Sequence, residues 1–438
     1  MPSFRSILRQ PDFFRLWVGQ IISSVGDRFY QFALLILVLG LNAGTQIGKE
    51  SSRIIFIGML PALIFAPFMG WAVDRFSRKA VLIFCDLVRV ILVLILLSLW
   101  FHSRNLVQVY LIVFGMGAMN CLFIPARQAV LPQLVQAAEL VNANALISLV
   151  GVIASLIGTV FAGLLSAIFG APLNFILTAI GFLCSAYFLW RIETSTYPPG
   201  LQKGGGWRAH WEDLSEGWRY VSENSHIRWL IGLCALFSFV SGFFAISVLE
   251  YVVTHLDLSS VQTVTRILTQ ILSHVAPKPP LFDLKVLALG FLLAGLGLGL
   301  GLGVFTCGRC KRWMHWKGLS LLAVFLNGLV MILLAMVQSY ELAWCFCVCL
   351  GWCGALWMIP LETRLQQGVP DIRRGRVFAL RNVATTAGFM LAFALNLSGT
   401  LLRDLGPQNL IQILGCSTVL FAILSAWIRR NEWREYWD

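Results

Sequence analysis

Long apolar runs, separated by short polar loops, dominate the chain from one end to the other. A run of about 20 apolar residues is long enough to cross the hydrocarbon core of a bilayer as a helix. Twelve such runs occur, near 13–41, 54–73, 80–101, 106–124, 142–168, 172–190, 229–254, 286–306, 318–337, 341–361, 377–402 and 409–428. A membrane β-barrel would show alternating segments of about ten residues instead. The pattern therefore predicts an all-α membrane protein with twelve transmembrane helices.

The composition excludes most other classes of protein. Of the 438 residues, 58% are hydrophobic and 12% are charged, whereas soluble domains average about 45–50% apolar and about 25% charged residues. A soluble enzyme and a disordered chain are both excluded, because disorder needs low hydrophobicity. The net charge of +12 is expected to lie on one side of a membrane, with no nucleic-acid partner. The 11 cysteines are scattered through apolar runs and are expected to be free thiols.

The lysines and arginines predict an orientation. If the N-terminus is cytoplasmic, 24 of the 33 Lys and Arg residues fall in cytoplasmic segments, 7 fall in outer loops and 2 lie within spans. Cytoplasmic loops of membrane proteins carry such an excess of cations. Both ends of the chain are basic, so an even number of spans with both termini inside fits best. We expect a multi-pass protein of the cell membrane, whether an inner or a plasma membrane.

The longest polar stretch, residues 191–228, divides the chain into two sets of six spans. Its tryptophans recur at helical spacing, which predicts a short amphipathic helix on the cytoplasmic face. Pro125 and Pro360 end the fourth and tenth spans at equivalent places, which indicates a duplicated six-helix unit. We expect an N-terminal bundle at 1–190, a linker at 191–228 and a C-terminal bundle at 229–438. In transporters built from such repeats, the substrate site lies near the midplane between them.

The eighth span carries glycine at every second position from Gly295 to Gly303. An open strand in lipid would leave its backbone groups unpaired, so a helix is expected. On a helix, Gly295, Gly299 and Gly303 form a four-residue repeat. This repeat predicts a face that packs closely against another helix.

Charged residues inside a span are costly and indicate function. Asp27, near the middle of the first span, is the first candidate for proton coupling, because a carboxyl removed from water can exchange a proton near neutral pH. Glu250, toward the outer end of the seventh span, is the second candidate. The alternative is that Asp27 pairs permanently with an arginine and is structural. Asp86 and Arg89, one helical turn apart in the third span, are expected to form a structural charge pair.

Several other polar and aromatic residues interrupt the spans and are candidates for lining a cavity. They are Phe29, Tyr30, Asn120, Asn174, Asn327 and Asn396. The asparagines either face a cavity or bond between helices, and the second role is the commoner one. The aromatic rings suit a bulky apolar substrate, with simple packing as the alternative.

The loop between the second and third spans places an acid among cations. It reads Gly70-Trp71-Ala72-Val73-Asp74-Arg75-Phe76-Ser77-Arg78-Lys79. Asp74 stands at the inner end of a helix, where it can cap the N-terminus of a neighbouring helix whose dipole favours an anion. Loss of that contact would let the halves move apart, which makes Gly70, Asp74, Arg75, Arg78 and Lys79 a candidate gating motif. The alternative is that the cations only anchor the loop to the cytoplasmic side.

This loop resembles the G-x-x-x-D-R-x-x-R-K signature of the major facilitator superfamily, at the place where that family keeps it. Other stretches resemble its macrolide-efflux and siderophore-exporter-like branch. They are Ser24-Val25-Gly26-Asp27, Asp86-Leu87-Val88-Arg89, Pro125-Ala126-Arg127-Gln128, and Val369-Pro370-Asp371 with Arg374-Gly375-Arg376. The second copy of the loop motif, Gly308-Arg309-Cys310-Lys311-Arg312, keeps the cations and lacks the acid.

The resemblance covers nearly the whole chain and implies two six-helix pseudo-repeats around a central cavity. It also implies that Asp74 caps the eleventh span, which begins near Arg376. Arg127, Gln128, Arg374 and Arg376 are the further positions that match motifs of the family.

The expected function is secondary active transport. We expect an efflux permease that moves a small amphipathic or apolar molecule by alternating access, coupled to protons. The chain has no Walker-type G-x-x-x-x-G-K-S/T segment, so ATP hydrolysis is not expected. An importer or a lysolipid or lipid flippase is the alternative, and a membrane-embedded enzyme is a remote one. The expected partners are a small-molecule substrate, protons and the lipid bilayer, with no cofactor and no metal, and the protein is expected to be a monomer.

Overall fold

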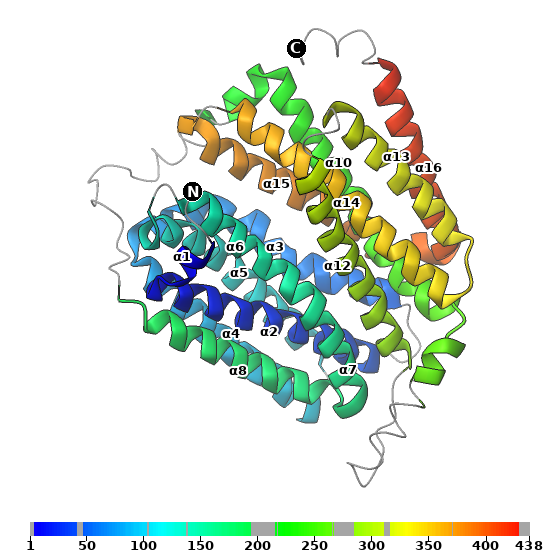
Figure 1. Cartoon of the computed structure of the whole chain (residues 1–438). Helices are drawn as coiled ribbons and strands as arrows, with labels where there is room; N and C mark the ends of the chain where they lie inside the picture. Colours follow the sequence, from blue (N-terminus) through cyan, green and yellow to red (C-terminus); the bar gives the residue numbers. More distant parts are fainter. Residues whose placement is uncertain are drawn as a thin grey trace.

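The computed structural model describes residues 4–41, 47–102, 105–136, 139–193, 215–216, 218–264, 266, 284–310, 316–369 and 371–428 (Figure 1). Within these residues the chain is helical, apart from turns and one isolated bridge between Asp257 and Ser339. The linker tryptophans Trp207 and Trp211 lie outside the described residues, as does most of the loop that follows residue 266.

The helices of the first half follow one another with short connections. They are α1 (Phe4–Leu8), α2 (Pro11–Leu41), α3 (Ile47–Arg75), α4 (Arg78–His102), α5 (Leu106–Leu134), α6 (Leu140–Ile153), a π-helical turn (Ala154–Gly158), α7 (Thr159–Phe169) and α8 (Ala171–Trp190). Local signals set some of their ends. The side chain of Asn105 caps α5 by accepting a hydrogen bond from the amide of Val107 at 3.0 Å. Gly170, at φ 77°, makes the turn from α7 to α8.

The second half repeats the arrangement. Its helices are α10 (Ser225–Thr254), α12 (Leu284–Cys310), α13 (Trp316–Ala335), α14 (Tyr340–Gly368), α15 (Asp371–Leu395) and α16 (Thr400–Ile428). The packing partners correspond between the halves: α3 packs on α5 as α12 does on α14, and α4 packs on α8 as α13 does on α16. The duplicated six-helix unit predicted from the sequence is thus visible in the helix pairings.

All twelve predicted spans coincide with helical segments. Eight helices in the described part of the chain are long and apolar enough to cross a membrane, namely α4, α5, α8, α10, α12, α14, α15 and α16. The other predicted spans lie in α2, α3, α13 and the run from α6 to α7. The chain is therefore a multi-pass membrane protein with an all-helical fold.

Three boundary predictions were wrong. Pro125 and Pro360 do not end their helices, because α5 and α14 continue past them. Membrane helices tolerate proline where neighbouring groups satisfy the freed carbonyl. The eleventh span stops at Leu395 rather than 402, and Gly399 (φ 72°) turns the chain into α16. The twelfth helix begins at Thr400 and bends at Gly406, where φ is 75°.

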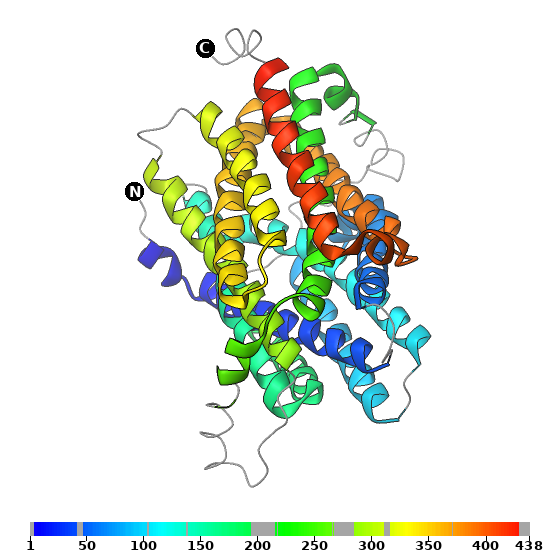
Figure 2. The same ribbon diagram turned by 90° about the vertical axis from the view of Figure 1, so that its right-hand side faces the viewer.

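The two halves meet at one end of the bundle and separate at the other. Between them, α7 packs on α12, and α3 packs on α15 and α10. Leu35, Ile55, Phe56 and Leu164 of the first half pack against the apolar core of the second half at the joined end. At the opposite end, each half has a cluster of its own with no residue from the other half. That open end carries α1 and the C-terminal end of α16 (Figures 1 and 2).

The predicted glycine face of α12 is confirmed. A Cβ atom built at Gly299 would lie 1.9 Å from the carbonyl oxygen of Val348 on α14, and one at Gly303 would lie 2.4 Å from Cβ of Ala355. Gly295 lies under the ring of Trp344. Only glycine permits this approach, which gives α12 one face of glycines against α14.

We expect Gly299→Ala to destabilise the protein strongly. The added methyl overlaps the backbone of α14, and such overpacking costs about 1–3 kcal/mol or more, which outweighs the roughly 0.5–1 kcal/mol that alanine contributes to a helix. The measurement is the melting temperature of the purified protein in detergent. Gly354→Ala on α14 is the matched control, because a Cβ there meets nothing within 4 Å. An unchanged melting temperature for Gly299→Ala would contradict this packing.

Candidate functional site

A cavity of about 530 Å³ lies between the two halves. Residues of α2, α3, α7, α10 and α12 line it. Most of the lining is aliphatic, and Arg28 and Gln31 are its largest polar side chains. The guanidinium Nη1 of Arg28 donates a hydrogen bond to Oε1 of Gln31 at 2.9 Å. The site thus combines an apolar wall with a single cationic group, which suits an amphipathic molecule.

The joined end of the bundle closes this cavity on one side. The amide Nδ2 of Asn396, in the turn that follows α15, donates to Oγ of Ser52 on α3 at 3.0 Å, and both side chains are fully buried. A Cβ atom at Gly290 of α12 would lie 3.2 Å from Cα of Gly163 on α7, so glycines let these two helices touch. Asn396 was a cavity candidate in the sequence, and it lies in the closure instead.

Arg28 reaches the cavity over the π-helical turn. A Cβ atom at Gly158, the last residue of that turn, would lie 3.0 Å from Cγ of Arg28. Glycine at this position therefore leaves room for the stem of the arginine. Single π-helical turns occur frequently at functional sites, and this one shapes the path of the only cation that lines the cavity among the described residues.

Five charged residues of the first half lie on its membrane-spanning helices. They are Asp27, Arg28, Asp86, Arg89 and Arg127, with three cations against two anions. Arg89, Arg28 and Arg127 are the cations whose charge acts on Asp27. The group carries an excess of one positive charge, so it favours either an anion or an ionised carboxylate nearby.

Arg89 is the centre of this group and is 1% exposed. Its Nη1 donates to Oδ1 of Asp86 at 3.2 Å, and its Nη2 donates to Oδ1 of Asn120. The guanidinium also lies over the ring of Phe123, 4.4 Å from its centroid. Asp86 and Arg89 therefore meet as an ion pair, and Asn120 supports that pair rather than lining a cavity.

Asp27 differs from its charged neighbours in its contacts. Among the described residues it makes no hydrogen bond and no salt bridge. Its place on α2 is fixed one residue earlier, where Thr178 of α8 donates to the carbonyl of Gly26 at 3.0 Å. Successive positions of a helix diverge by about 100°, so Asp27 and Arg28 point in different directions, and only Arg28 lines the cavity.

The remaining candidates of the first half take packing positions. Tyr30 belongs to the apolar core of that half, and Phe29 packs beside Ala162 at the junction with α12. Asn174 is fully buried and donates to the carbonyl of Ala162 at 2.9 Å and to Oγ of Ser166 at 2.6 Å. Tyr30 and Asn174 thus lie inside the bundle and do not line the cavity between the halves.

The structure describes the side chains of some motif residues and not of others. Arg78 donates to the carbonyl of Ala129 at 2.7 Å, and Lys79 donates to the carbonyl of Ile192 at 2.6 Å. Lys79 thus binds the chain just past the C-terminal end of α8, where the helix dipole favours positive charge, whereas Arg78 binds α5 more than one turn before that helix ends. The side chains of Gly70, Asp74, Arg75, Arg374 and Arg376 lie outside the described residues.

The other two family positions lie on α5. Nη1 of Arg127 donates to Oε1 of the buried Gln20 on α2 at 2.9 Å, while Gln128 is exposed. Glu250 lies near the C-terminal end of α10, beside Leu249, and does not line either cavity among the described residues.

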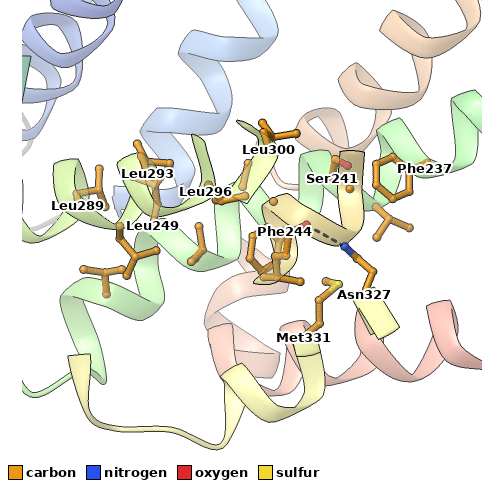
Figure 3. Close-up of a pocket in the computed structure, with 18 residues that line it drawn as sticks. Phe237, Ser241, Phe244, Leu249, Leu289, Leu293, Leu296, Leu300, Asn327 and Met331 are labelled. Atoms are coloured by element: carbon orange, nitrogen blue, oxygen red, sulfur yellow. Dashed lines mark hydrogen bonds between the residues drawn. The ribbon is translucent and has the colours of Figure 1, made fainter. Parts of the chain in front are cut away.

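A second cavity, of about 310 Å³, lies inside the second half between α10, α12, α13 and α14 (Figure 3). Its lining is almost wholly apolar. Asn327 points into it from α13 and donates to the carbonyl of Leu350 at 3.4 Å. Asn327, a cavity candidate in the sequence, therefore does line a cavity, although not the one between the halves.

Sequence reasoning missed Gln31, Gln20 and the π-helical turn. Gln31 follows Arg28 by three residues, one turn of a helix, inside an otherwise apolar stretch. That spacing was a usable signal. The π-helical turn at Gly158 leaves no comparable mark, because its residues read as an ordinary apolar helix. Among the described residues, no three His, Cys, Asp or Glu side chains gather as they would around a metal ion.

Comparison with known proteins identifies relatives over nearly the full length. The chain is 23% identical over 430 residues to the uncharacterized MFS-type transporter YfiS of Bacillus subtilis, which covers 97% of this chain and 94% of that protein. It is 27% identical over 212 residues to the putative bacilysin exporter BacE of Bacillus amyloliquefaciens, about half of each chain. It is 22% identical over 380 residues to the lysophospholipid transporter LplT of Escherichia fergusonii, 85% of each.

The fold is shared with solved transporters. The nucleoside transporter NupG superposes with a TM-score of 0.67 over 94% of this chain and 98% of its own, at 12% identity. The sequence model of the Major Facilitator Superfamily matches residues 16–393 of this chain. These proteins are transporters rather than enzymes, and the chain belongs to the Major Facilitator Superfamily.

Proposed function

We propose that this transporter exports small amphipathic molecules and that protons drive it. The observation that carries the proposal is the cavity between the halves, where aliphatic side chains from both halves surround one arginine. A sugar or nucleoside would need many polar partners, and this lining offers few. The relative BacE is named as a putative exporter, which supports the outward direction.

The orientation follows from the cations of the sequence. With both termini and the linker 191–228 in the cytoplasm, the open end of the bundle faces the cytoplasm. The cavity would then take its molecule from the cytoplasm or from the inner leaflet. Asn396 and Ser52 would hold the outer side shut in this state. Export requires that this contact breaks while the open end closes.

Proton coupling is assigned to Asp27. It is the carboxyl of α2 that lies among three arginines and makes no hydrogen bond within the described residues. Protonation would change the balance of charge in the first half by one unit. Because Arg28 is the next residue and lines the cavity, the change would reach the site where a substrate lies. Glu250 is the second candidate.

A lysophospholipid flippase is the second candidate function. The apolar cavity inside the second half favours it, since that cavity would suit a hydrocarbon chain. The relative LplT is named as a lysophospholipid transporter. Export of a soluble amphiphile and movement of a lysolipid differ in where the molecule enters, from water or from the inner leaflet.

The test is transport by the purified protein in proteoliposomes with an imposed pH gradient. The panel pairs amphiphiles, including a fluorescent fatty acid and a lysophosphatidylglycerol, with sugars and nucleosides of similar mass. We expect gradient-dependent movement of an amphiphile and none of the hydrophilic compounds. Movement of the sugars or nucleosides alone would refute the proposal. If only the lysophosphatidylglycerol moves, the flippase replaces the exporter.

The gating motif gives a separate prediction. We expect Asp74→Asn to insert and fold normally and to slow transport by about twofold to thirtyfold, because the lost charge–dipole contact contributes roughly 0.3–2 kcal/mol. The measurement is the initial transport rate at matched expression. Asp404→Asn, whose carboxylate is exposed, is the control. An unaltered rate for Asp74→Asn would remove the motif from the mechanism.

A further inference from the structure

We propose that the cavity inside the second half binds the hydrocarbon tail of the transported molecule, while the arginine of the first cavity binds its anionic head. The transported class would then be single-chain anionic amphiphiles. The inference rests on the proposed function, because it assumes that the cavity between the halves holds the substrate. It adds a second subsite and the chemistry of both ends of the molecule.

The two cavities are neighbours that share a wall. Five leucines line both of them, namely Leu249, Leu289, Leu293, Leu296 and Leu300. The four leucines of α12 are spaced by four, three and four residues, so they form one stripe of the helix. The glycine face of α12 packs against α14, and the leucine stripe faces the two cavities. A chain that passes between these leucine side chains crosses from one cavity into the other.

The leucine wall is made of adaptable side chains. Leu300 is 39% exposed, and Leu293 and Leu296 are only partly buried. An unbranched hydrocarbon chain can pass between the leucines once their side chains change rotamer. Exposed side chains change rotamer on fast timescales. The backbone behind them stays fixed by the contact of Gly299 with Val348. The wall can therefore open for a chain without unpacking α12 from α14.

The inner cavity has the dimensions and the polarity of a hydrocarbon chain. A methylene occupies about the volume of a water molecule, roughly 30 Å³, so a cavity of about 310 Å³ holds a chain of about ten methylenes. Phe244 and Met331 supply a ring and a flexible thioether to its surface (Figure 3). Met adapts to irregular apolar shapes. Ser241 and Asn327 are the only polar side chains among the described residues that line this cavity, and the amide of Asn327 donates to Leu350.

The head of such a molecule is expected at Arg28. Its guanidinium lines the first cavity beside Gln31, and a planar, delocalised cation binds carboxylates and phosphates well. Arg28 is the only cation among the described residues that line this cavity, so an anionic group of the molecule would pair with it. The first half would thus bind the anionic head and the second half the hydrocarbon tail, so one molecule would contact both halves at once.

Gly354 provides a way to fill the inner cavity alone. It lines this cavity from α14, and a Cβ atom there meets nothing within 4 Å. It does not line the cavity between the halves. Gly354→Phe therefore places a ring in the empty space. Gly232→Phe on α10 is the matched control, because a Cβ there also meets nothing within 4 Å and Gly232 lines neither cavity. Ser241→Phe fills the same cavity from α10 if the first variant does not fold.

The experiment is photolabelling of the purified full-length protein in nanodiscs, with decanoate that carries a diazirine at its end. Labelled peptides are located by mass spectrometry. We expect labels near Phe244 and Asn327, and binding that is about tenfold weaker in Gly354→Phe, the loss expected when about two methylenes no longer reach an apolar site. Gly232→Phe should bind as the unaltered protein does, and butanoate should bind weakly to all three.

Three results would overturn the proposal. Labels confined to the cavity between the halves would leave the inner cavity without a role in binding. Equal binding by Gly354→Phe and Gly232→Phe would do the same. A phospholipid that copurifies with the protein and is not displaced by decanoate would make the cavity a structural lipid site. Labelling needs no transport, so a protein that binds decanoate here but moves no amphiphile contradicts the proposed function and leaves the cavity assigned.

Discussion

Replacement of Asp27 by asparagine is expected to abolish gradient-driven accumulation while substrate binding persists. One proton moved per cycle across a gradient of one pH unit supports about tenfold accumulation, since 1.4 kcal/mol corresponds to a factor of ten. Asparagine keeps the shape of the side chain and cannot take up the proton. The accumulation ratio should therefore fall to about one. The measurement is uptake into proteoliposomes with and without the pH gradient.

Two further variants make this result specific. Glu250→Gln removes the second candidate for proton coupling, and Asp404→Asn removes an exposed carboxylate. We expect both to respond to the gradient as the unaltered protein does. Exchange of labelled for unlabelled substrate, which needs no net proton movement, should survive in Asp27→Asn. A gradient response retained by Asp27→Asn and lost by Glu250→Gln would transfer the coupling role to α10.

The architecture was predictable because it depends on the length and spacing of the apolar runs along the chain. Twelve apolar runs of membrane-spanning length require helices, since a bilayer offers no partner to an unpaired backbone. The glycine repeat from Gly295 to Gly303 also translates directly into a contact, because only a missing Cβ permits it. Helix ends were less predictable. Pro125 and Pro360 are typical of breaks in soluble helices, and α5 and α14 run past both.

The site was only partly predictable, for a geometric reason. A single polar residue in an apolar run is a candidate for function, because its burial is costly. The sequence does not show toward which neighbour its side chain points. Asp86 and Arg89 could be paired from their spacing, because residues three apart share a helix face. Asn327 and Asn174 look alike in the sequence, yet one points into a cavity and the other lies inside the packed first half. Their partners come from helices distant along the chain, which one sequence does not encode locally.

Arg89→Leu is expected to be the most destabilising single substitution in the first half. It removes the partner of a fully buried aspartate, and an uncompensated buried charge costs about 3–5 kcal/mol. Asn120 would lose its partner as well. We expect little folded protein after extraction, or a melting temperature lowered by many degrees. The measurement is the folded yield and melting temperature in detergent.

The double variant Asp86→Leu/Arg89→Leu separates stability from function. Removal of both charges leaves no unpaired ion, and replacement of a buried pair by apolar residues is often neutral or stabilising by about 1–4 kcal/mol. Asp86 Oδ2 and Arg89 Nε already lack hydrogen-bond partners within the described residues, so the pair is only half satisfied. We expect the double variant to recover most of the folded yield. If it also transports, the pair is purely structural. If it folds and no longer responds to a pH gradient, Arg89 acts through Asp27, whose charge it faces.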